Sequence, residues 1–186
     1  MRITGGMLKG RTLRAPEGRD TRPTADRVRE ALFNILTHHD WGEGLGDALE
    51  GAMVLDAFAG TGALGIEAIS RGAASCIFFE KDRKALTCLK ENLRLLGDGK
   101  AANVLPVDVT RPPKSTQAAT LVFLDPPYHK GLIEAALAGL SAQGWIAPHA
   151  LLVCETAKNE SLTLPAPFTL VAERTYGDTK LWFACG

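Results

Sequence analysis

The chain has 186 residues, of which 46% are hydrophobic and 23% charged, and its formal net charge is zero. This composition is that of a globular protein with a real core, and it excludes a low-complexity chain; no apolar run approaches the length of a membrane span. The N-terminus lacks an apolar leader, and neither the four cysteines nor the histidines have the spacing of metal ligands or of a redox pair. We therefore expect a reduced, cytoplasmic protein that holds no metal and contacts no membrane.

Charge is unevenly distributed along the chain. Residues 1–29 carry eight Lys and Arg against three Asp and Glu, whereas residues 30–186 carry 13 basic and 18 acidic residues. We interpret residues 1–23 as a basic extension and residues 24–186 as one globular domain. A basic extension on a mildly acidic body is typical of binding to a polyanion, although a solvated N-terminus explains the charge equally well.

The N-terminal elements are a hairpin and a helix. Ile3 and the run 11–15 are expected to pair as a short hairpin around Gly5-Gly6 and Gly10. Apolar residues then recur at three- and four-residue spacing up to His38, which predicts a helix with Thr24 as its N-cap.

Strand and helix patterns alternate from residue 52 to residue 155, and two further strands then follow around Gly177-Asp178, a hairpin signal. Strands are expected at 52–56, 75–80, 103–109, 120–125, 150–155, 168–176 and 180–184, and helices at 62–70, 82–96 and 132–140. This order predicts a doubly wound α/β fold whose seven-stranded sheet is mostly parallel, with an antiparallel strand at the C-terminal end.

A glycine-rich loop follows the first strand. Gly60, Gly62 and Gly65 form G-x-G-x-x-G between a strand and a helix, and Glu80 lies 20 residues after Gly60, at the end of the next strand. Glycines let a ligand approach the backbone, and an acid at that place can bind two ribose hydroxyls. Asp56 at the strand end would repel a diphosphate, so it favours an adenosine ligand with an ammonium or sulfonium group over a dinucleotide.

Two further acids are expected at strand ends. Asp108 is placed at the end of the third strand, where it can accept from an adenine amino group or cap the following turn. Asp125 opens the sequence Asp125-Pro126-Pro127-Tyr128 after a buried strand. The prolines stiffen this loop, which directs a carboxylate, a carbonyl and an aromatic face toward a planar group with an amino substituent.

With these motifs the chain resembles the class I, Rossmann-like S-adenosylmethionine-dependent methyltransferases. More narrowly, it is similar to the bacterial family that methylates N2 of a guanine in 16S ribosomal RNA. The matching segments are 10–13, 21–34, 56–65, 79–82, 125–128 and 176–177.

The resemblance implies a role for each matching residue. S-adenosylmethionine would be bound by Asp56, Phe58, Ala59, Gly60, Gly62, Gly65, Glu80, Asp108 and Val109. The methyl-transfer step would depend on Asp125, Pro126 and Tyr128. The RNA would be contacted by Arg11, Arg22, Thr24, Arg27, Arg29 and Pro127. The implied substrate is 16S ribosomal RNA or the assembling 30S subunit, and we expect a monomer.

Three other interpretations remain open from the residues. A nicotinamide-dependent oxidoreductase would use the same glycines and Glu80, but it leaves the Asp125 loop unexplained. A noncatalytic RNA-binding module would not need the strand-end acids. The amino group of adenine or cytosine, or a protein amide, could replace guanine in the same chemistry, and only the resemblance favours guanine.

Overall fold

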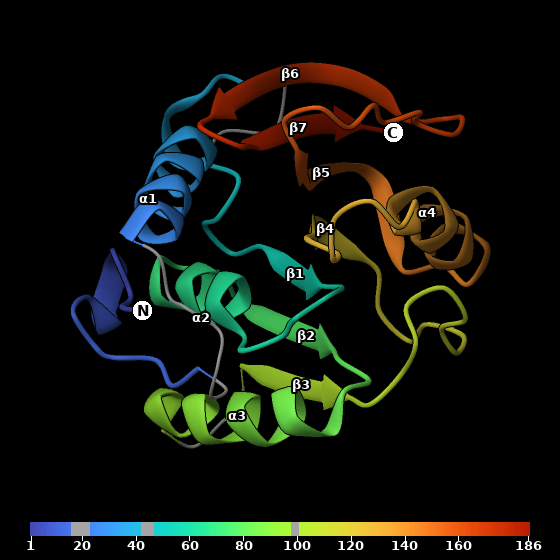
Figure 1. The fold of residues 1–186 in the computed structure, drawn as a ribbon. Helices are drawn as coiled ribbons and strands as arrows, with labels where there is room; N and C mark the ends of the chain where they lie inside the picture. The colour runs from blue at the N-terminus through green and yellow to red at the C-terminus, as the bar shows by residue number, and fades with distance from the viewer. Residues whose placement is uncertain (16–22, 42–46, 98–100) are drawn as a thin grey trace.

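The predicted strands form one seven-stranded sheet in the order β3-β2-β1-β4-β5-β7-β6 (Figure 1). The computed structural model describes residues 1–15, 23–41, 47–97 and 101–186. The strands are β1 (Met53–Asp56), β2 (Ser75–Phe79), β3 (Ala102–Leu105), β4 (Ala119–Leu124), β5 (Ile146–Ala157), β6 (Thr169–Tyr176) and β7 (Thr179–Cys185). The helices are α1 (Pro23–His38), α2 (Ala63–Ser70), α3 (Arg83–Leu93) and α4 (Leu132–Ala142), with 3-10 turns η1 (Gly6–Leu8) and η2 (Arg94–Leu96).

The sheet has the predicted mostly parallel topology. Strands β1 to β5 pair in parallel, and β7 runs antiparallel to both β5 and β6. The two-residue connection at Gly177-Asp178, with Gly177 at φ 59°, turns β6 into β7 as the hairpin signal predicted. Together with the solved structures reported below, this topology confirms the prediction of a Rossmann-like fold.

Alternating residues of the central strands enter different cores on the two faces of the sheet. Leu121 and Phe123 of β4 pack with α1, α2 and α3, whereas Val122 and Leu124 pack with α4. All four side chains are fully buried, and burying each contributes about 1.5–3 kcal/mol of transfer free energy. Covered on both faces, the sheet exposes the loops at the carboxyl ends of its parallel strands, which is where α/β folds bind ligands.

The N-terminal hairpin is present as predicted, and it packs at the opposite, amino edge of the sheet. Residues Arg2 and Thr12 form an antiparallel bridge, and Ile3 N–H donates to the Arg11 carbonyl at 3.0 Å. The hairpin is attached to α2 by Glu67, whose carboxylate accepts from the backbone N–H of Thr4 and of Gly5. The boundary between residues 1–23 and 24–186 stays a prediction.

Two predicted element ends are wrong, and both errors concern proline. The third strand ends at Leu105 rather than at Val109, because Pro106 has no N–H to continue the ladder. Helix α1 begins at Pro23, so Thr24 lies inside its first turn and is not the N-cap. In the part of the chain that the structure describes, no helix is long and apolar enough to cross a membrane.

Candidate active site

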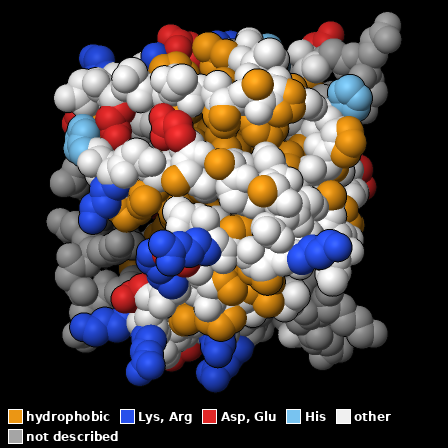
Figure 2. Space-filling view, turned by 90° about the vertical axis from the view of Figure 1, so that its right-hand side faces the viewer, with side chains coloured by type: hydrophobic (Ala, Val, Ile, Leu, Met, Phe, Trp, Pro, Cys, Tyr) orange, Lys and Arg blue, Asp and Glu red, His pale blue; other side chains and the backbone are white. Residues whose placement is uncertain are grey.

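A cavity of about 780 Å³ lies at the carboxyl edge of the sheet. The arrowheads of β1, β2 and β3 point toward the right of Figure 1, and Figure 2 shows that side of the molecule. On this face Lys and Arg side chains gather in the lower part, at the height of α3 and β3. The predicted site residues that line the cavity are Phe58, Gly60, Glu80, Asp108, Val109, Asp125, Pro126, Pro127 and Tyr128.

Glu80 is held in place by the glycine-rich loop and by the start of α3. Its Oε2 accepts from Gly60 N–H at 2.8 Å, and its Oε1 accepts from Asp82 N–H at 2.7 Å. Asp82 is itself the N-cap of α3, because its side chain accepts from Ala85 N–H. Each carboxylate oxygen has a second lone pair, so a fixed Glu80 can still accept hydrogen bonds from two neighbouring hydroxyl groups.

Asp108 is a charged acceptor on the other side of the cavity, three residues beyond the end of β3. Its Oδ2 accepts from Lys81 Nζ at 2.8 Å, and its Oδ1 accepts from the hydroxyl and the N–H of Thr110. The hydrogen bond from Lys81, followed by those from Thr110, lowers the pKa of Asp108 to about 2. Both readings of the sequence therefore apply, since Asp108 stabilises its own turn and also borders the cavity.

Asp56 does not line the cavity among the residues that the structure describes, which corrects the expectation that it lies against the ligand. Its side chain is 2% exposed and its Oδ2 accepts from Gly65 N–H at 3.0 Å. Burial raises the pKa of Asp56 to about 7, the Gly65 hydrogen bond lowers it, and the charge of Glu80 adds to the rise. Asp56 thus holds the glycine-rich loop onto the end of β1.

Gly62 and Gly65 also act through the shape of the loop. Gly62 has a φ of 80° at the position before α2, a conformation that favours glycine. A Cβ on Gly65 would lie 2.3 Å from the Phe78 ring and 2.6 Å from the Cys76 sulfur, so α2 could not pack this closely on β2. Both glycines, like Ala59, lie outside the set of described residues that line the cavity.

The Asp125 loop borders the cavity directly after β4. Asp125 is half-buried, Pro126 is buried, and Pro127 and Tyr128 are exposed. The Tyr128 hydroxyl donates to Glu155 Oε1 at 2.6 Å and lies 3.1 Å from the Thr179 hydroxyl. Burial, and next the Glu155 hydrogen bond, raise the pKa of Tyr128 well above that of an ordinary tyrosine, so the phenol stays protonated.

Glu155 is a site residue that the sequence analysis missed. Leu124 of β4 pairs with Cys154 of β5, so the next residues along the two strands are Asp125 and Glu155. A fifth carboxylate therefore stands beside the four expected at strand ends. Its signal was its place at the end of a predicted strand, but only the register of β4 with β5 identifies Asp125 as its neighbour.

Of the basic residues expected to contact RNA, Arg29 is corrected. Its side chain is 6% exposed and binds the Arg2 carbonyl, Asp26 at 3.1 Å and Glu67 at 3.6 Å, so it is a core cation. Arg11 and Arg27 are exposed. Arg22 and the side chain of Thr24 lie outside the described residues. Among the residues that are described, no group of three or more His, Cys, Asp or Glu could hold a metal ion.

A Rossmann-like sheet with an acid at the end of each central parallel strand is the architecture of the class I methyltransferases, and known proteins place the chain further. It belongs to the family described as conserved hypothetical protein 95, whose model matches residues 1–185. It is 36% identical over 181 residues to the Ribosomal RNA small subunit methyltransferase D of Haemophilus influenzae, covering 95% of this chain and 89% of that one. To the protein of the same name from Escherichia coli K12 it is 39% identical over 178 residues, covering 95% and 85%.

A solved structure shows the same fold. The Escherichia coli protein yhhF superimposes with a TM-score of 0.80 at 34% identity, covering 100% of this chain and 97% of that one.

Proposed function

We propose that this chain transfers a methyl group from S-adenosylmethionine to the exocyclic N2 amine of a guanine in 16S ribosomal RNA. The observation that carries the proposal is the position of the Asp125 loop, which borders the same cavity as Glu80 and Asp108. The relatives named as small-subunit ribosomal RNA methyltransferases support the substrate, and the resemblance described above supports guanine. Ribosomal RNA as substrate places the reaction in the cytoplasm, and we expect the chain to act as a monomer.

The residues of the cavity fit S-adenosylmethionine. Glu80 would accept from the ribose hydroxyls, and Asp108 from the adenine amino group beside the buried Val109. Phe58 and Gly60 leave an apolar wall and an open backbone next to Glu80. Asp56 would act indirectly, by fixing the loop that carries Gly60.

When bound, S-adenosylmethionine supplies a methyl group on a positively charged sulfur, which is already an activated electrophile. The protein then has to align the guanine N2 with that methyl group and to accept hydrogen from a weak nucleophile. The Asp125 carboxylate and the Pro126 carbonyl would accept the two N2 hydrogens, which favours positive charge on the nitrogen as it attacks. Asp125 would take the proton that N2 loses, directly or through water, while Tyr128 stacks on the base.

The basic residues on two sides of the molecule would bind the phosphates. Lys81, Lys84 and Lys130 line the cavity, and Arg11 and Arg27 are exposed elsewhere. The hairpin with Arg11 lies at the amino edge, so we expect it to contact a part of the RNA away from the target base.

The test is labelled methyl transfer to 16S ribosomal RNA from cells that lack this activity, followed by nucleoside analysis. Free RNA and 30S subunits are compared in parallel. We expect N2-methylguanosine to carry the label. Label in methylated adenine or cytosine would replace guanine by another base, and binding of RNA without any transfer would favour a noncatalytic module. Equilibrium binding of NADH in preference to S-adenosylmethionine would contradict the class of reaction.

A further inference from the structure

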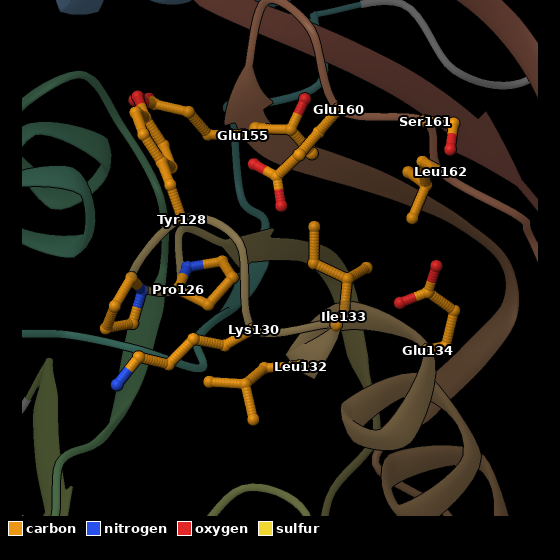
Figure 3. Close-up of a pocket in the computed structure, with 13 residues that line it drawn as sticks. Pro126, Tyr128, Lys130, Leu132, Ile133, Glu134, Glu155, Glu160, Ser161 and Leu162 are labelled. Atoms are coloured by element: carbon orange, nitrogen blue, oxygen red, sulfur yellow. The ribbon is translucent and has the colours of Figure 1, made fainter.

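The side chain of Tyr128 is fixed by partners from two other strands. Its hydroxyl donates to Glu155 Oε1 at 2.6 Å and lies 3.1 Å from the hydroxyl of Thr179. Glu155 belongs to β5 and Thr179 is the first residue of β7, whereas Tyr128 belongs to the loop after β4. In Figure 3 the side chains of Tyr128 and Glu155 meet at their oxygen atoms, on one side of a small cavity of about 40 Å³.

The backbone of the same loop is held by a second carboxylate. Glu160 Oε1 accepts from His129 N–H at 2.7 Å, and Glu160 Oε2 accepts from Ala157 N–H at 2.9 Å. His129 has a φ of 61°, which a residue with a side chain seldom adopts without support from its surroundings. Figure 3 shows the Glu160 carboxylate directed toward this loop. The loop is therefore tied to the end of β5 through one side chain and one backbone group.

We propose that Glu155 is a positioning residue for methyl transfer: through the Tyr128 hydroxyl it sets the aromatic ring against which the target base stacks. The inference rests on the proposed function and deepens it, since it makes the C-terminal hairpin part of the base-binding site. Glu155 lines the small cavity behind the loop, whereas Asp125 lines the large one. Its effect on the base is thus indirect, and it differs from that of Asp125.

A comparison of acceptor and charge at position 155 tests this role. Glutamine keeps an oxygen that can accept from the Tyr128 hydroxyl, and alanine does not. We expect Glu155→Ala to lower kcat about tenfold through a misplaced ring, and Glu155→Gln to stay within about twofold of the wild type. Equal losses in both variants would mean that the carboxylate charge itself is needed, and would overturn the positioning role.

A double-mutant cycle separates this coupling from general damage. Tyr128→Phe removes the hydroxyl and keeps the ring, and we expect it to lower kcat about as much as Glu155→Ala does. The double variant should lose no more than either single variant, because both changes break the same contact. Multiplying losses would show that Glu155 acts by another route. Glu134→Gln is the matched control, since Glu134 lines the same small cavity and bonds Thr163 N–H instead of the loop.

Two measurements make the outcome independent of folding and of the substrate. Binding of S-adenosylhomocysteine by calorimetry and the thermal midpoint should be unchanged in every variant; losses there would assign the effect to stability. The chain has two tyrosines, so Tyr176→Phe leaves Tyr128 as the only phenol to titrate by ultraviolet absorbance. Burial, Glu155 and the charge of Asp125 raise its pKa, and Thr179 lowers it.

Up to about pH 11, one unit above an ordinary tyrosine, we expect no ionisation of Tyr128 in the Tyr176→Phe protein and clear ionisation once Glu155→Ala is added. Ionisation that does not respond to Glu155→Ala would mean that the contact is absent in solution. This titration needs no substrate, so it stands even if the wild type transfers no methyl group to ribosomal RNA. Such a failure would count against the proposed function alone.

Discussion

The two edges of the sheet use carboxylates in opposite ways. At the amino edge, Glu67 is fully buried and accepts from Thr4, Gly5 and Arg71, so the protein itself occupies it. At the carboxyl edge, Glu80 and Asp108 also have internal donors, but they border a cavity of about 780 Å³. The difference teaches that internal hydrogen bonds alone do not mark an acid as structural. Access to a ligand-sized cavity separates the two kinds.

The largest expected effect is at the carboxyl edge. Asp125→Ala should lower the rate of methyl transfer about 10³-fold, because the acceptor of the N2 hydrogens is lost. The dissociation constant of S-adenosylhomocysteine should change little. Asp125→Asn, which keeps an acceptor oxygen without the charge, should fall between the two in single-turnover assays. A fast Asp125→Ala enzyme would remove the distinction between the two edges.

At the amino edge the expected effect is on stability. Glu67→Ala leaves Arg29 and Arg71 without their shared carboxylate, and we expect a loss of about 3 kcal/mol in urea denaturation. Glu91→Ala breaks the exposed pair with Arg14, whose side chain is 74% exposed, and should cost less than about 1 kcal/mol. Folded Glu67→Ala protein should bind S-adenosylhomocysteine normally; weakened binding would link the two edges.

Asp56 lies between these cases, as a buried acid next to the ligand loop. Its folded pKa of about 7 exceeds the usual 3.8, so the native state binds more protons than the unfolded state between these values. Stability should therefore fall as pH rises, by about 2 kcal/mol from pH 5 to pH 7. In Asp56→Asn this slope should flatten. Asp108→Asn is the control, because its pKa of about 2 places its effect below pH 4. An unchanged slope in Asp56→Asn would show that Asp56 titrates normally.

The smallest expected effect concerns the basic hairpin. Lys9→Ala with Arg11→Ala should weaken binding to 16S ribosomal RNA about threefold and should lower the salt dependence by about one to two phosphate contacts. Arg174→Ala on β6, also exposed, is the matched control. Equal effects of the hairpin and control variants would reduce the hairpin to a structural cap on α2.

The sequence predicted the sheet and most of its ligand edge because strand ends can be recognised from apolar runs and the residues that follow them. Asp125 and Glu80 were located in this way, and both line the cavity. Arg29 was misassigned because a charge pattern does not reveal that Glu67, distant in the chain, buries the guanidinium. Glu155 was missed because its neighbour is set by the register of β4 with β5. Asp56 was placed against the ligand, since the sequence does not show that its carboxylate turns toward Gly65.

A crystal structure with S-adenosylhomocysteine tests the central claim most directly, namely that the strand-end acids of the carboxyl edge form a methyl-donor site. We expect the ribose at Glu80, the adenine between Asp108 and Val109, and the sulfur facing the Asp125 loop. A ligand bound elsewhere, or an Asp125 carboxylate turned away from the sulfur into the protein interior, would contradict it.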